Sequence, residues 1–91
     1  MKNFKGKWIF NSTPGIAYVA KIKKAEEYHA DKSGSFLLVY SVEEIIHIVK
    51  ETLEIKSMKY FKPKTPFSVE KNNLRKSEPL ARKSLIKELL S

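Results

Sequence analysis

The chain has 91 residues, contains no cysteine and carries a formal net charge of +8. A chain of this length forms one domain with a modest core. Without cysteine it has neither disulfides nor thiolate metal sites. No apolar run approaches the roughly 20 residues of a membrane-spanning helix, and the basic N-terminus lacks the apolar core of a signal peptide. We therefore expect a soluble, cytoplasmic protein.

The positive charge is concentrated in the C-terminal part of the chain. Residues 1–55 carry eight Lys against seven acids, whereas residues 56–91 carry eight Lys and two Arg against three acids. Such asymmetry indicates a polyanionic partner, most often nucleic acid. The alternative is compositional: 16 of the 18 basic residues are Lys, and Lys-rich composition also follows from an AT-rich genome or a thermophilic lifestyle.

Two strands are predicted near the N-terminus. Residues 6–11 alternate Trp8 and Phe10 with smaller or polar side chains, which is the period of a strand. Turn-forming residues follow. Residues 15–23 have two interpretations, because Thr13 and Pro14 could begin a helix, whereas strand spacing gathers the apolar side chains on one face. The pattern favours a second strand that pairs with the first as a hairpin. The residues sharing that face are Ile16, Tyr18, Ala20 and Ile22.

The middle of the chain predicts a strand followed by a helix. The apolar run at 36–40 suits a buried strand. Ser41 and Glu44 then have the spacing of a capping box, and apolar residues recur at helical intervals as far as Leu53. We expect an amphipathic helix over residues 42–54. Before the strand, residues 24–32 predict a short exposed helix or an irregular connection.

The last third predicts an edge strand, an extended connection and a helix. Residues 55–61 are β-branched and aromatic, with lysines that protect a sheet edge. Prolines make residues 62–76 an extended, mobile connection, with Phe67 and Val69 pinned to the core. A Ser-Glu-Pro sequence then predicts a C-terminal helix over residues 78–90.

The expected fold class is α+β. It consists of a small mixed or antiparallel sheet of three to four strands, packed by the 42–54 helix, together with the C-terminal helix at 78–90. We expect a single domain made of an α+β core at 1–62, an extended basic connection at 63–76 and the helix at 77–91.

The sequence contains no motif for catalysis or cofactor binding. Two histidines, His29 and His47, do not make a metal site without further ligands, and both are expected at the surface. Three glycines are too scattered for a phosphate-binding loop. A small basic ribonuclease is the enzyme class that is hardest to exclude. We expect no catalytic residues, metal, cofactor, small-molecule substrate or membrane partner.

The leading functional hypothesis is a small nucleic-acid-associated accessory or regulatory protein. Lysine contacts to phosphate are largely non-specific, so Arg75 and Arg82 are the candidates for bidentate contacts. The predicted phosphate-binding residues are Lys62, Lys64, Lys71, Arg75, Lys76, Arg82, Lys83 and Lys87.

Two further surfaces are candidates. The alternative function is a protein-interaction module that oligomerises or inhibits a partner through an edge strand or an apolar arc of the C-terminal helix. The residues of that arc that would bind a partner are Leu85, Ile86, Leu89 and Leu90. Aromatic residues on strands could also stack unpaired bases, although such residues are more often core. These aromatic residues are Trp8, Phe10, Tyr18, Tyr60 and Phe61.

Overall fold

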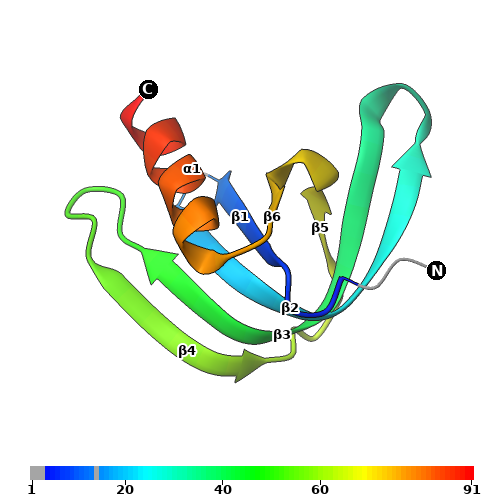
Figure 1. Cartoon of the computed structure of the whole chain (residues 1–91), viewed down its shortest axis with the longest axis horizontal. Coiled ribbons are helices and arrows are strands. Elements are labelled where there is room, and N and C mark those ends of the chain that lie inside the picture. Colours follow the sequence, from blue (N-terminus) through cyan, green and yellow to red (C-terminus); the bar gives the residue numbers. More distant parts are fainter. Residues whose placement is uncertain (1–3, 14) are drawn as a thin grey trace.

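The computed structural model describes residues 4–13 and 15–91, and it shows an antiparallel β-sheet with one C-terminal α-helix (Figure 1). The strands are β1 (Trp8–Thr13), β2 (Ile16–Ala30), β3 (Gly34–Ile48), β4 (Ile55–Phe61), β5 (Phe67–Glu70) and β6 (Leu74–Arg75). Two 3₁₀ turns, η1 (Asp31–Ser33) and η2 (Lys71–Asn73), join strands, and α1 (Glu78–Leu90) ends the chain. The α+β class is confirmed, with six strands in place of the expected three to four.

The two longest strands organise the sheet. The strand order is β4-β3-β2-β1-β6, and β5 pairs separately with β3. Strands β2 and β3 have 15 residues each, and their register shifts between Lys21 and Ala25. Such irregularities bend a strand and increase its twist. Figure 1 shows the β2–β3 hairpin curving away from the rest of the sheet, so β3 pairs with β5 before the bend and with β4 after it.

The buried residues form two core clusters on opposite faces of the bent sheet. One core cluster lies beneath α1, and the other lies on the opposite face. Successive residues of a strand point to opposite faces, so Trp8 and Phe10 enter the first cluster while Ile9 enters the second. The first cluster consists of Trp8, Phe10, Ala17, Val19, Ile46, Ile48, Ala81 and Leu85. The second consists of Phe4, Ile9, Tyr18, Ala20, Ile22, Leu37, Val39, Val42, Ile45 and Val69.

The predicted helix over residues 42–54 is wrong. Strand β3 continues to Ile48, and residues 49–54 form the turn to β4. The adjacent Ile45 and Ile46 are both buried because they enter opposite core clusters. A strand covered on both faces loses the alternating pattern that would distinguish it from a helix. Ser41 is a buried strand residue with 8% exposure, so its spacing to Glu44 does not mark a cap.

The hairpin of β1 and β2 confirms the strand interpretation of residues 15–23. The helical or irregular interpretation of residues 24–32 is wrong, because β2 runs to Ala30 and pairs with β3. Its mostly polar sequence lacks the apolar alternation of a strand, although its partner strand follows directly after η1. Strand β4 lies at the end of the strand order, as expected of an edge strand.

In the C-terminal third, the predicted core contacts of Phe67 and Val69 and the predicted helix are present. The 62–76 connection includes β5, η2 and β6; Val69 is buried, and Phe67 packs against the same cluster. Helix α1 has the predicted bounds of 78–90 and packs on β1 and β2. Ser77 occupies its N-cap position without a side-chain capping bond. In the described ranges, no helix has the length and apolar character needed to cross a lipid bilayer.

The turn after β3 provides a test of the strand assignment. Leu53 has a left-handed φ of 58° and is 40% exposed, and its N–H donates to the Val49 carbonyl. A left-handed conformation at a non-glycine residue destabilises the folded state by about 1–2 kcal/mol. Glycine removes this strain, but its greater freedom in the unfolded chain lowers stability by roughly 0.5–1 kcal/mol.

Leu53→Gly should therefore leave the free energy of unfolding unchanged or raise it by up to about 1 kcal/mol. Urea unfolding measures the change, and Leu53→Ala serves as a control that keeps the backbone strain. A loss above about 2 kcal/mol for Leu53→Gly would indicate a buried Leu53 in a helix instead.

Candidate nucleic-acid interface

The structure divides the eight predicted phosphate-binding residues among three places. Lys62 and Lys64 lie in the loop between β4 and β5, and Lys71 and Arg75 lie in η2 and β6. The remaining four lie on α1 or just before it: Lys76, Arg82, Lys83 and Lys87. Figure 1 shows the β4–β5 loop and α1 in different parts of the molecule, so these residues do not form a single patch.

Arg75 is held inside the fold. Its Nε donates to Ser84 Oγ over 3.1 Å, and one terminal nitrogen donates to the carbonyls of Asn72 (2.6 Å) and Leu74 (2.8 Å). Its guanidinium carbon also lies 5.0 Å from the centre of the Phe10 ring. Arg75 thus ties β6 to α1, and a bidentate contact to a base would have to replace these bonds.

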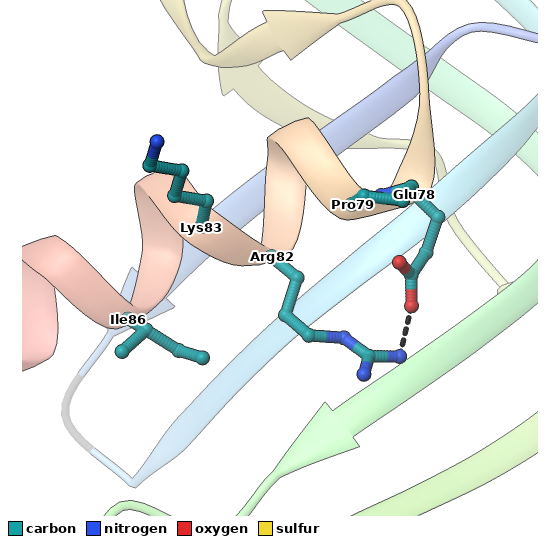
Figure 2. Close-up of a pocket in the computed structure, with 5 residues that line it drawn as sticks. All are labelled: Glu78, Pro79, Arg82, Lys83 and Ile86. Atoms are coloured by element: carbon teal, nitrogen blue, oxygen red, sulfur yellow. Dashed lines mark hydrogen bonds and ion pairs between the residues drawn. The ribbon is translucent and has the colours of Figure 1, made fainter.

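Two more of the predicted cations have acidic partners within the chain. Lys71 Nζ lies 2.8 Å from a carboxylate oxygen of Glu27, and Arg82 forms an ion pair with Glu78 one helical turn away. Figure 2 shows Arg82 reaching toward Glu78, while Lys83 points away from both. Although these residues line an open depression of about 420 Å³, the Glu78 carboxylate offsets the guanidinium charge there.

Of the eight predicted phosphate-binding residues, five are exposed lysines. None of them forms an ion pair within the part of the chain that the structure describes. Lys83 and Lys87 are one turn apart and lie on the same face of α1, so both can reach one polyanion. The five exposed lysines are Lys62, Lys64, Lys76, Lys83 and Lys87.

The apolar arc predicted to bind a partner is mostly used inside the chain. Leu85 is fully buried, Leu89 packs against the same cluster, and Ile86 is half-buried. Leu90, by contrast, is 73% exposed, and Leu80 at the other end of α1 is 48% exposed. The most exposed apolar side chains of α1 therefore lie at its two ends.

Three of the five aromatic residues predicted for base stacking are buried and not on an open surface. Trp8, Phe10 and Tyr18 are buried in the two core clusters. Burial raises the pKa of Tyr18, and a hydrogen bond with Asn11 lowers it by a smaller amount. The Tyr60 and Phe61 side chains lie outside the described residues.

Sequence reasoning missed a different set of aromatic residues, on the outer face of the β2–β3 hairpin. Tyr28 is 39% exposed, and Phe36 and Tyr40 are partly exposed. Tyr28 pairs with Phe36 in the strand register. The period of two in β3 could have identified this face had residues 24–32 been assigned to a strand. We call this surface the aromatic face, and it consists of Lys24, Glu26, Tyr28, Phe36, Leu38, Tyr40, Ser68 and Glu70.

Contacts across the strands fix the rings of the aromatic face. The rings of Tyr28 and Phe36 stack with centroids 5.6 Å apart and an interplanar angle of 19°, and the Tyr28 hydroxyl bonds to Ser68. The Tyr40 hydroxyl donates to Glu26 over 3.1 Å, and this bond raises the pKa of Tyr40 above its ordinary value. These contacts set the ring orientations.

The two histidines lie on different strands. His29 Nδ1 lies 3.0 Å from Ser35 Oγ at an exposed position of the hairpin, and the His47 ring lies 6.4 Å from the Tyr18 ring. A catalytic pair of Ser35 as nucleophile and His29 as base would need a third group that orients the His29 ring. Among the described residues, no acid forms a hydrogen bond with His29. Within residues 4–13 and 15–91, no three metal-binding side chains come together.

Comparisons of the chain with protein-family models, with curated proteins and with solved structures gave no match. Any functional assignment therefore depends on the residues and contacts of this chain alone.

Proposed function

We propose that the chain is a small, non-catalytic nucleic-acid-binding protein that contacts phosphates through exposed lysines of its C-terminal half. The observation that carries this proposal is the exposure of Lys62, Lys64, Lys76, Lys83 and Lys87, all without an ion pair in the described residues. Of the acids in the same half, Glu78 is already paired with Arg82. An excess of unpaired positive charge attracts polyanions.

The same geometry favours binding that does not depend on base sequence. Arg75 and Arg82 are the two arginines of the chain, and both are engaged by neighbouring groups. The exposed cations are lysines, which act as point charges and lack the planar fork that recognises guanine. Phosphate contacts position a protein on nucleic acid without reading its sequence. An accessory or regulatory role fits this mode of binding.

Salt dependence tests the proposal. Fluorescence anisotropy on a mixed-sequence duplex should show an affinity that falls steeply with salt, by about 0.9 log units per log unit of salt for each phosphate neutralised. Lys83→Gln combined with Lys87→Gln should lower that slope by up to about 2.

The control removes the same charge elsewhere. Lys32 and Lys56 are exposed and lie outside the predicted site, so replacing both by Gln should change the slope much less. If neither duplex nor single-stranded oligonucleotides bind at about 50 mM salt, the proposal is wrong, because phosphate contacts are strongest at low salt.

A protein-interaction module is the second candidate, and the observation that favours it is the edge of β4. In the described part of the chain this strand pairs with β3 alone, and its first residue, Ile55, is 51% exposed. An unpaired edge offers backbone N–H and C=O groups to a strand from another chain. Lys56, also exposed on β4, opposes such pairing. Under this alternative, the full chain would sediment as a dimer or co-sediment with a partner.

A further inference from the structure

The aromatic face has no role in the core of its own hairpin. The opposite face of the same strands already places Leu37, Val39 and Val69 in the second cluster. Tyr28 is 39% exposed on the outer side, and Phe36 and Tyr40 are partly exposed there. These rings are therefore accessible to a ligand on the outer side of the hairpin.

The rings are spaced along β3. Phe36 and Tyr40 are four residues apart on the same face of this strand, which separates them by about 13 Å at the rise of an antiparallel strand. Leu38 lies between them on that face, so the surface between the rings is apolar. The face offers two stacking positions: the Tyr28–Phe36 pair near the hairpin tip, and Tyr40 near the bend.

Positive charge gathers at the Tyr40 end. Lys24 Nζ lies 5.5 Å from the Tyr40 ring centre. The β4–β5 loop begins after Phe61, which pairs with Val42 of β3. It ends before Phe67, which pairs with Val39 of the same strand. This loop carries Lys62 and Lys64 and therefore emerges from the sheet beside Tyr40.

Two carboxylates shape the charge on the aromatic face. Glu70 pairs with Phe36 in the strand register, and Glu26 accepts a hydrogen bond from Tyr40. Glu70 disfavours phosphate beside Phe36, whereas Glu26 lies at the Tyr40 end and offsets part of the lysine charge there. The phosphates of a bound strand are therefore expected at the lysine end, with bases directed toward the rings.

We propose that the aromatic face binds single-stranded nucleic acid, with unpaired bases stacked on Tyr28, Phe36 and Tyr40 and phosphates held by Lys24 and the lysines of the β4–β5 loop. This proposal rests on the proposed function, which makes nucleic acid the ligand. It adds the aromatic face as a second binding surface and single strands as the class of ligand. Aromatic side chains combined with lysines are the usual means of binding single strands, and the stacking is tolerant of sequence. Bases inside a duplex do not present their faces, so the aromatic face selects unpaired strands.

The test compares labelled oligothymidylate with a duplex of equal length in anisotropy titrations. Tyr28→Ala and Tyr40→Ala should each weaken oligothymidylate binding by about 5- to 150-fold, which is the range for removing one stacked base. Both variants should leave duplex binding unchanged. Tyr40→Phe keeps the ring but loses the bond to Glu26, and it should bind single strands as tightly as the unaltered chain. Glu26→Gln should strengthen single-strand binding because it removes a negative charge from the face.

The outcomes separate this inference from the proposed function. One outcome would be that Tyr28→Ala and Tyr40→Ala leave oligothymidylate binding unchanged, while replacing Lys83 and Lys87 weakens the binding of both oligothymidylate and duplex. The aromatic face would then not be the binding site, and phosphate binding by lysines would stand. If Tyr40→Phe binds as weakly as Tyr40→Ala, the ring does not stack a base, and the inference is overturned. If no oligonucleotide binds at low salt, both proposals are overturned.

Discussion

Replacing Leu85 with alanine should lower the free energy of unfolding by about 2–5 kcal/mol, whereas Leu90→Ala should change it by less than about 0.5 kcal/mol. The two leucines lie on the same helix, but Leu85 is fully buried and Leu90 is 73% exposed. Leu85 packs in the cluster that also contains Trp8 and Ile46. Its removal leaves a cavity between α1 and the sheet, and the surrounding side chains fill such a cavity only in part.

The comparison measures whether α1 is docked in solution. An isolated helix of 13 residues is marginal in water, so α1 depends on its packing against the sheet. Urea unfolding of the two variants gives the difference, and the identical chemistry of the substitutions removes helix propensity from the comparison. Equal, small losses would mean that α1 does not pack on its own sheet and is available to a partner.

Local signals were sufficient where the apolar period agrees with the turn or capping residues beside it. The β1–β2 hairpin was predicted because alternating strands flank a run of turn formers. Helix α1 was predicted because Ser77 and Pro79 mark its start. In these segments, the periodic pattern, the turn residues and the final contacts agree, which is the condition for reading structure from sequence.

The signals failed where a strand is mostly polar or where both of its faces are covered. Residues 42–48 are apolar at positions that suit either a helix or a strand buried on two sides. β-Branched residues such as Ile45, Ile46 and Ile48 favour the strand, but the apparent capping box outweighed them. Residues 24–30 carry too few apolar side chains to reveal the second half of β2, whose pairing depends on β3.

The charge asymmetry was visible in the sequence, but the partners of individual cations were not. Lys71 reaches Glu27 across 44 positions of the chain, and Arg75 reaches Ser84 only because α1 folds back on β6. The spacing of Arg82 and Glu78, by contrast, is the ordinary one for an ion pair within a helix. The aromatic face was missed because its strand assignment was missed.

The hairpin that carries the aromatic face depends on the residues behind it. Leu37 and Leu38 are adjacent on β3 and point to opposite sides. Leu37 is fully buried in the second cluster beside Val39 and Val69, whereas Leu38 is only partly buried, on the aromatic face. Because the two positions share one strand and one residue type, their difference isolates the side on which the core lies.

Leu37→Ala should lower the free energy of unfolding by about 2–5 kcal/mol, while Leu38→Ala should lower it by about 1 kcal/mol or less. Removal of the Leu37 side chain leaves a cavity in the second cluster, whereas the space left by Leu38 opens to water. Urea unfolding followed by far-ultraviolet circular dichroism measures both changes, and an unchanged slope with denaturant shows that the unfolded states are comparable. A larger loss for Leu38 would place the core on the other side of the hairpin, and the proposed stacking surface would then be interior.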